Sequence, residues 1–331
     1  QKPIFNWPKL VEAKEKEITR LSGLYKANLE RSGVQMVEAR ATVLDAHRVR
    51  LSNGREISAK YILVATGATP AMEPAVPGME LGITSNDVFD LKEFPKRLFI
   101  IGGGYIAVEF ASVFARLGSD VHQAMRADNV LRGFDGDMRN GVRDALTHAG
   151  VKFHFGVLPT KIEKSASGLR VSLSNGEALE VDQVLVATGR VPHTKGLGLE
   201  NAGVTNRVNL TPVAIREGHA FADTVFGGKH VTVVHQGIPT AVFTTPEIGT
   251  VGLTEEEARA IFDVVDIYST SFRPMKATLS GRAEKTIMKI VVDGQSGKVL
   301  GVHVLGHDAG EMAQLLGIAV KVGAAHPQRA A

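Results

Sequence analysis

The sequence contains no cysteine. This absence excludes disulfide scaffolds, thiolate metal sites and cysteine nucleophiles within these residues. Aromatic residues are scarce at 6%, but apolar residues reach 44% and charged residues 22%, which is the composition of a globular protein with ample core. At 331 residues the chain is long enough for about two domains.

Long apolar runs are also missing. A membrane helix needs roughly 18 consecutive apolar residues, and the longest apolar stretch, Leu98 to Phe110, is interrupted by three glycines. The opening, Gln1 to Leu10, has no apolar core, so we expect no signal peptide. We therefore expect a cytoplasmic protein that does not contact a membrane.

A dense patch of one charge is absent as well. The net charge is +3, and the lysines and arginines are scattered, which argues against a nucleic-acid partner. The eleven histidines form no pair on one helix face, and there is no His-Glu cluster. We therefore predict no metal site. The motifs of serine hydrolases and P-loop NTPases are not present.

The sequence does contain an internal repeat. Leu51-Ser-Asn-Gly54 recurs as Leu173-Ser-Asn-Gly176, and the run Tyr61-Ile-Leu-Val-Ala-Thr-Gly67 recurs as Gln183-Val-Leu-Val-Ala-Thr-Gly189. Both pairs are separated by 122 positions. Each copy predicts a strand, an Asn-Gly hairpin turn, a second strand and then a buried apolar strand. Two units of similar topology are therefore expected.

A glycine-rich turn opens the second unit. The short apolar run Arg97–Ile101 predicts a buried strand, which leads into Gly102-Gly-Gly104 and a helix that ends near Gly118. The next strand is expected at 121–125. A G-x-G-x-x-A pattern indicates dinucleotide binding when it lies between a strand and a helix, as this one does. The offset of 122 would place the first unit's equivalent of Gly102 before residue 1, so the first unit lacks such an opening.

The residues around this turn favour NADPH over NADH. Gly102 permits the tight turn, Gly104 lets the backbone approach a pyrophosphate, and Ala107 allows the helix to pack closely on the strand. An NAD site has an acidic residue at the end of the second strand, whereas here Arg126 follows that strand and Arg132 lies six residues on. Two guanidinium groups can bind a 2′-phosphate. The alternative is that both arginines are solvated surface residues.

The last third of the chain predicts a separate α+β region. Thr254-Glu-Glu-Glu257 is a capping box that begins a helix. The segments 287–292 and 299–305 predict a hairpin, and 310–322 predicts an amphipathic helix. We therefore expect an α/β fold. It contains two Rossmann-like three-layer nucleotide-binding units, of which the first is incomplete, and a C-terminal α+β domain.

Several of these segments resemble the glutathione reductase family of FAD-dependent pyridine nucleotide-disulfide oxidoreductases. The resemblance extends over nearly the whole chain. It is carried by the following motifs: Gly102-Gly-Gly-Tyr-Ile-Ala-Val-Glu109, Val130-Leu-Arg-Gly-Phe-Asp135, Ala187-Thr-Gly-Arg-Val-Pro192, Leu210-Thr-Pro-Val-Ala214, Ile248-Gly-Thr-Val-Gly-Leu253 and Tyr268-Ser-Thr-Ser-Phe272.

The resemblance implies an activity and a domain order. Hydride would pass from NADPH to FAD, then to a cysteine pair, and then to glutathione disulfide, in a homodimer that maintains thiol redox homeostasis. The implied domains are a remnant of the FAD-binding domain at 1–90, an NADPH-binding Rossmann domain at 91–195, a return segment of the FAD-binding domain at 196–228, and a dimerisation domain at 229–331.

The resemblance also implies roles for individual residues. Tyr105 would be a lid over the nicotinamide and Glu109 would lie beside the flavin–nicotinamide stack, while His326 would be the catalytic histidine. The residues implied for NADPH are Gly102, Gly104, Tyr105, Ile106, Glu109, Arg126, Arg132 and Gly189. The residues implied for FAD are Thr66, Gly67, Arg190, Leu210 and Thr211.

The sequence departs from the family pattern in separate places. The first G-x-G-x-x-G motif and the C-x-x-x-x-C redox pair are absent, the Gly-Asp segment expected between Val204 and Leu210 is not found, and the glutamate that should follow His326 is missing. One hypothesis is a glutathione reductase from which segments are missing. The alternatives are an NADPH-binding dimeric module without disulfide chemistry, and a diaphorase-like NADPH oxidoreductase.

Overall fold

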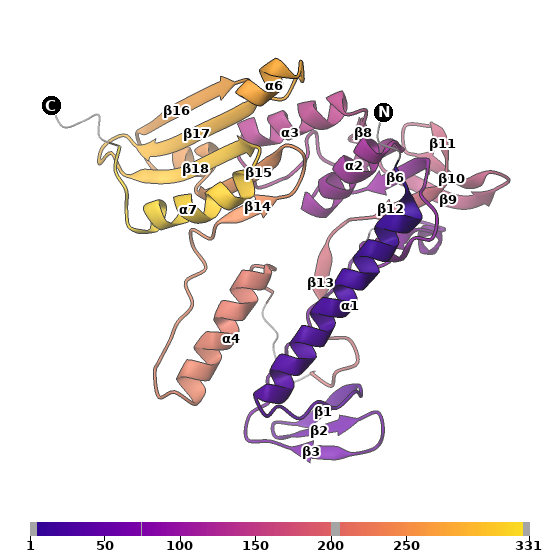
Figure 1. Ribbon diagram of the computed structural model, residues 1–331, viewed down its shortest axis with the longest axis vertical. Coiled ribbons are helices and arrows are strands. Elements are labelled where there is room, and N and C mark those ends of the chain that lie inside the picture. Colours follow the sequence, from indigo (N-terminus) through magenta and orange to yellow (C-terminus); the bar gives the residue numbers. More distant parts are fainter. Residues whose placement is uncertain (1–4, 74, 200–205, 327–331) are drawn as a thin grey trace. The chain divides into compact units, whose positions relative to one another are not determined.

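A computed structural model describes residues 5–73, 75–199 and 206–326 (Figure 1). Its contacts divide the chain into two compact units. Unit 1 comprises Gln1–Ala71, Asn86–Phe94 and Arg190–Val213, and unit 2 comprises Met72–Ser85, Pro95–Gly189 and Ala214–Ala331. Within the described residues, no helix is long and apolar enough to cross a membrane.

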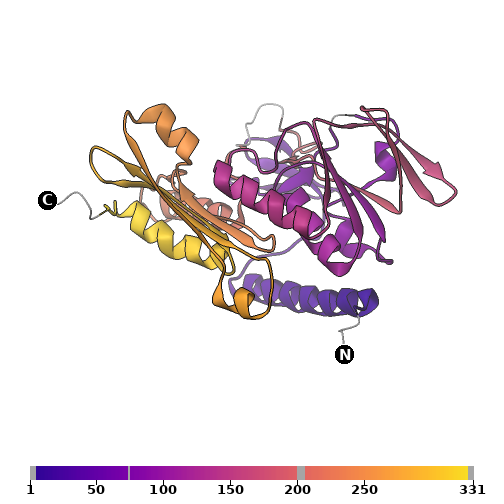
Figure 2. The same cartoon turned by 90° about the horizontal axis from the view of Figure 1, so that it is seen from above.

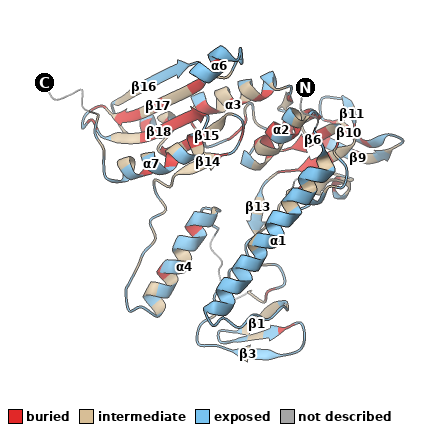
Figure 3. Ribbon diagram, viewed as in Figure 1, coloured by how far each residue is buried: buried red, intermediate tan, exposed pale blue. Residues whose placement is uncertain are grey.

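Unit 2 contains a parallel five-stranded sheet. Its order is β5 (Ile83–Thr84), β12 (Gln183–Val186), β6 (Arg97–Ile101), β7 (Asp120–Met125) and β8 (Lys152–Phe155). Every neighbouring pair is parallel. Four consecutive residues of β6, from Leu98 to Ile101, are buried, because a central strand covered on both faces must be apolar throughout. Figure 3 shows these buried residues in red.

Two different layers cover this sheet. Helix α2 (Tyr105–Leu117) packs on β6 and β7 and ends at Gly118, whose φ of +105° suits glycine. An antiparallel meander of β9 (Pro159–Ser165), β10 (Gly168–Leu173) and β11 (Ala178–Val181) covers the other face. Phe99 and Val184 of the parallel sheet pack against Ile162 and Val171 of the meander. This three-layer arrangement is the Rossmann-like unit that the sequence predicts.

The second sheet of unit 2 is antiparallel. Its order is β14 (Thr240–Val242), β15 (Glu247–Gly252), β18 (Val299–Gly306), β17 (Thr286–Asp293) and β16 (Val265–Phe272). Helix α7 (Ala309–Lys321) lies against it (Figure 2). The predicted hairpin, the final helix and the capping box of α5 (Glu255–Ile261) are all confirmed. A short helix, α6 (Met275–Leu279), follows β16.

Helix α3 (Gly136–His148) belongs to the Rossmann-like part and packs on β18. At Gly141 an added Cβ would lie 2.3 Å from Leu305 Cδ2 and 3.1 Å from Ile287 Cδ1. The glycine therefore leaves room for the two side chains, and the helix lies close to the sheet. The nucleotide-binding part and the antiparallel sheet of unit 2 are therefore in direct contact.

Unit 1 has much less buried surface. Helix α1 (Trp7–Arg31) contains no buried residue and is mostly exposed in Figure 3. An antiparallel sheet of β1 (Ala41–Asp45), β2 (Arg48–Leu51) and β3 (Glu56–Ser58) stands apart from a ribbon of β4 (Ala68–Pro70) and β13 (Arg190–Pro192). Helix α4 (Thr211–Val225) begins in unit 1, and short 3-10 helices span Met79–Leu81 and Val88–Asp90.

The internal repeat is a repeat of structure. In both hairpins the Asn side chain accepts the N–H two residues on, at 3.1 Å each for Asn53 and Asn175. The leucine N–H before each turn also donates to the carbonyl after it, at 2.8 Å in both copies. In addition, β4 and β13, which are equivalent segments of the two copies, pair with each other.

One predicted strand is not formed. The run 61–65 was expected to be a buried strand, but the structure has no strand there, and Tyr61 and Leu63 are 45% and 58% exposed. The reason is the lack of a partner. The equivalent strand β12 is buried because it pairs with β5 and β6, whereas among the described residues no strand pairs with the run 61–65.

A candidate NADPH site

A cavity of about 550 Å³ lies at the carboxyl ends of β6, β7 and β12. In open parallel sheets this edge is where ligands bind, at the point where the strand order reverses. The residues that line the cavity are Glu73, Ile101, Gly102, Gly103, Gly104, Tyr105, Ile106, Met125, Arg126, Ala127, Asn129, Arg132, Leu158, Ala187, Thr188 and Gly189. All of them belong to unit 2.

The glycine turn forms the floor of this cavity. Gly102 has a φ of +133°, and a Cβ there would lie 2.3 Å from the carbonyl oxygen of Ala187. The buried Gln123 fixes the turn from behind, because its Nε2 donates to the Gly102 carbonyl at 2.9 Å. Gly104 is the N-cap of α2 and no side chain caps its N–H groups. Uncapped N–H groups at a helix start form an anion site.

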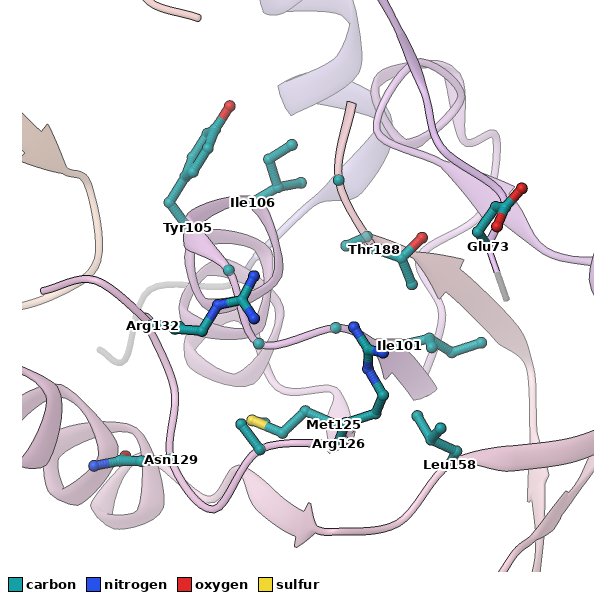
Figure 4. Close-up of a pocket in the computed structure, with 16 residues that line it drawn as sticks. Glu73, Ile101, Tyr105, Ile106, Met125, Arg126, Asn129, Arg132, Leu158 and Thr188 are labelled. Atoms are coloured by element: carbon teal, nitrogen blue, oxygen red, sulfur yellow. The ribbon is translucent and has the colours of Figure 1, made fainter. Parts of the chain in front are cut away.

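Two arginines lie beside the glycine turn and point into the cavity (Figure 4). Both Arg126 and Arg132 are exposed, and in the described part of the chain neither makes a hydrogen bond or an ion pair. Arg132 is presented by a reverse turn, in which the Phe134 N–H donates to the Leu131 carbonyl at 3.1 Å. Gly133, at the third position of this turn, has a φ of +90°, a conformation that favours glycine.

The cavity contains seven of the eight residues predicted to bind NADPH. The eighth, Glu109, lies one turn further along α2 and accepts the Phe243 N–H at 2.9 Å. Burial raises the pKa of Glu109, and this hydrogen bond opposes the rise. Tyr105 is the first residue of α2 and is 42% exposed.

The residues predicted for FAD lie in unit 1, and only three of the five are brought together. Thr66 Oγ1 donates to the His193 carbonyl at 2.9 Å, the Gly67 carbonyl accepts the His193 N–H, and Arg190 donates to the Ala68 carbonyl. Leu210 and Thr211 stand at the start of α4, which makes no hydrogen bond with this ribbon in the described part of the chain.

A cradle for the FAD phosphates is not formed by the described residues of unit 1. The long helix α1 begins at Asn6, whose side chain caps the Lys9 N–H, and not at a glycine turn. The residues present therefore fit NADPH in unit 2, but they do not fit the FAD pyrophosphate in unit 1.

His326 does not line the cavity. The His326 ring stacks on the Tyr268 ring with centroids 4.1 Å apart, and the His326 backbone N–H donates to the Gly297 carbonyl at 2.8 Å. The predicted Gly-Asp position between Val204 and Leu210 falls partly outside the described residues. Among the described residues, no three His, Asp or Glu side chains gather as they would around a metal ion.

Some cavity residues were not predicted from the sequence. Thr188 could have been found, because it lies in the repeated Ala-Thr-Gly segment. Glu73, Asn129 and Leu158 come from loops without a motif, and only the folded chain brings them to the cavity. Glu73 lies on the far side from Arg132 in Figure 4.

The fold agrees with comparisons to known proteins. A family model described as pyridine nucleotide-disulphide oxidoreductase matches residues 2–212, and its dimerisation domain matches residues 238–330. The chain belongs to this oxidoreductase family. The resemblance inferred from the sequence motifs is thereby confirmed, as is the expected fold class.

Individual relatives support the same assignment. The chain is 45% identical to glutathione reductase from Burkholderia cepacia, covering 96% of this chain and 76% of that protein, and 37% identical to trypanothione reductase from Leishmania donovani, covering 96% and 73%. The flavoprotein disulfide reductase RclA from Escherichia coli has a similar structure, with a TM-score of 0.88, 25% identity and coverage of 97% and 81%.

The alignment also bears on the missing segments. It spans 343 positions against the Burkholderia protein, which is more than the 331 residues of this chain. Within the aligned region, that relative therefore carries positions that have no counterpart in this chain.

Proposed function

We propose that this chain is the NADPH-binding and dimerisation part of a flavoprotein that reduces glutathione disulfide with NADPH. The observation that carries the proposal is the pair of exposed arginines that line the cavity beside the glycine turn, in a chain 45% identical to a glutathione reductase. The activity is that of an oxidoreductase acting on a sulfur group, with glutathione disulfide as substrate and a homodimer as the assembly.

The proposal assigns roles to the cavity. The N–H groups at the start of α2 would hold the pyrophosphate, and Arg126 and Arg132 would bind the 2′-phosphate. Gly102, Gly104, Ile106 and Gly189 would let the cofactor approach the backbone. Tyr105 would cover the nicotinamide, which donates a hydride when NADPH is bound. Glu109, one turn away, would lie beside the flavin–nicotinamide stack.

FAD is the second cofactor of the family, and the hydride acceptor when bound. In this proposal Thr66, Gly67, Arg190, Leu210 and Thr211 contribute to its site, although the described residues do not form the phosphate cradle. The proposal also keeps His326 as the catalytic histidine, a cytoplasmic location, and the segments 1–90, 91–195, 196–228 and 229–331 as domains.

The absence of cysteine favours a second candidate for the chain as printed. Disulfide exchange requires attack by a thiolate, and the sequence contains none. The printed chain alone would therefore be an NADPH-binding dimeric module. A diaphorase-like activity is less well supported, because it needs bound flavin.

One experiment separates these candidates. The natural protein is purified, its intact mass and visible spectrum are recorded, and NADPH oxidation is followed with and without glutathione disulfide. A flavin spectrum, a mass well above 35.4 kDa and oxidation that depends on glutathione disulfide support the reductase. A colourless protein of 35.4 kDa that binds NADPH without oxidising it would refute the reductase and leave the module.

A further inference from the structure

The turn that presents Arg132 is held at both ends. At its start, the Leu131 N–H donates to the Gly103 carbonyl at 2.7 Å, which ties the turn to the glycine loop. Leu131 is 1% exposed and has a φ of +53°, so its backbone is strained and fixed by its surroundings. At its end, Phe134 is followed directly by Asp135, which is 1% exposed.

Asp135 is anchored by a lysine from the antiparallel sheet. Lys289 of β17 is 2% exposed, and its Nζ lies 3.0 Å from Asp135 Oδ2. The same Nζ contacts Asp137 at 2.8 Å and Glu255 at 2.7 Å. Asp135 also accepts the N–H groups of Asp137 and Glu255, both at 3.1 Å. One buried ammonium therefore joins β17, the start of α3 and the start of α5.

We propose that Lys289 is a positioning residue for the NADPH 2′-phosphate site. It acts through Asp135, which fixes the exit of the turn that presents Arg132 to the cavity. This inference rests on the proposed function, since it assumes that Arg132 binds the 2′-phosphate.

The charges around Lys289 make this anchor rigid. Burial alone would raise the pKa of Asp135, but the Glu255 N–H and Lys289 outweigh it, and the net shift is downward. Burial would lower the pKa of Lys289, but its three carboxylate partners raise it above its ordinary value. Both groups are therefore charged at neutral pH. Breaking such a pair from one side leaves an uncompensated buried charge, so Asp135 would move and the turn with it.

Two other titratable groups near Asp135 and Lys289 have hydrogen-bond partners of their own. His303 lies opposite Lys289 across β17 and β18, is fully buried, and bonds Thr250 and the Leu253 carbonyl. Glu256 accepts the Gly136 N–H at 3.2 Å. Neither group contacts Asp135 or Lys289 through a hydrogen bond or ion pair in the described residues. Lys289 is the cation that holds Asp135.

The test measures the dissociation constants of NADPH and NADH by fluorescence titration for the full chain and for Lys289→Met. We expect the Kd for NADPH to rise by about tenfold, the worth of one charge-assisted contact, and the Kd for NADH to change by less than about twofold. The matched control is Lys285→Met, an exposed lysine just before β17, which should leave both constants unchanged.

A double-mutant cycle with Arg132→Ala separates positioning from general destabilisation. If Lys289 acts through Arg132, then Lys289→Met in the Arg132→Ala background causes no further loss of NADPH affinity. Equal losses for NADPH and NADH, or full additivity with Arg132→Ala, would overturn the proposal.

Lys289→Met could impair folding, so the double variant Lys289→Met/Asp135→Asn is measured in parallel. It removes both buried charges together and keeps an N-cap side chain on α3. An NADPH-specific loss of affinity in this double variant supports the proposal. An unchanged preference for NADPH over NADH refutes it. If Arg132→Ala itself has no NADPH-specific effect, the proposed cofactor site fails. If Arg132→Ala has that effect and both Lys289 variants do not, only the positioning role fails.

Discussion

Two glycines of the same turn serve different physical needs. Gly102 has a positive φ, and a Cβ there would collide with the Ala187 carbonyl. Gly104 has a φ of −81°, which any residue can adopt, and nothing lies within 4 Å of an added Cβ. The first glycine is therefore required by the fold, and the second keeps the cavity open for a ligand.

Alanine substitutions should separate these roles. Gly102→Ala is expected to lower the free energy of unfolding by about 2–4 kcal/mol, because strain and a backbone clash combine. Gly104→Ala should leave the melting temperature unchanged but weaken NADPH binding, since its methyl group points into the cavity. Thermal melts and NADPH titrations of both variants check this. A stability loss in Gly104→Ala equal to that in Gly102→Ala would contradict it.

Among the secondary-structure elements, α1 and α2 differ in what stabilises them. Helix α2 buries Ala107, Val108 and Phe114 against the parallel sheet. Helix α1 is longer but buries no residue. Its anchors are near its start, where Trp7 Nε1 donates to the Leu91 carbonyl at 2.8 Å and the Trp7 ring packs on Phe94. A helix without tertiary packing is only marginally stable.

Hydrogen exchange should report this difference. In the printed chain, amides of α1 beyond its first turns are expected to exchange faster than those of α2 by at least about a hundredfold, because local opening of α1 breaks few contacts. Mass spectrometry of peptic fragments gives the measurement, with β6 as the protected reference. Equal protection of α1 and α2 would show that α1 is packed in solution.

The elements that the sequence predicted correctly are those with local signals. The strand 97–101, the helix that ends at Gly118 and the capping box at Thr254 each depend on neighbouring residues. The run 61–65 carries the same apolar signal as β12, but a buried parallel strand needs partners, and periodicity does not reveal whether they exist. Arg126 and Arg132 were found by spacing, whereas Glu73 reaches the cavity only through tertiary folding.

For the molecule as a whole, the largest exposed apolar side chains of α7 lie on one face. Leu315 and Ile318 of α7, and Val322 at its C-cap, are 71%, 65% and 78% exposed, and their spacing of three and four residues places them together. The opposite face packs Ala309 and Ala313 on the antiparallel sheet. Because this helix lies in the family's dimerisation domain, we expect the exposed face to be covered by a second copy.

The molecular mass of the protein in solution tests this expectation. Light scattering should give twice 35.4 kDa for the chain, and Leu315→Glu with Ile318→Glu should give the monomer mass, since burying two carboxylates in an apolar contact is costly. Ile261→Glu is the control, because Ile261 is similarly exposed at 66% on α5. A dimer that survives both α7 substitutions would rule out this face as the interface.

The central claim is that the cavity of unit 2 binds NADPH through its 2′-phosphate. The measurement that tests it most directly is the ratio of the NADH and NADPH dissociation constants, for the chain and for Arg126→Ala/Arg132→Ala, with Arg170→Ala as the exposed control outside the cavity. Each guanidinium contact is worth about 1.5–3 kcal/mol, so we predict tighter binding of NADPH by about a hundredfold or more and a ratio near one in the double variant. Equal affinities for the two cofactors in the unchanged chain would contradict the account.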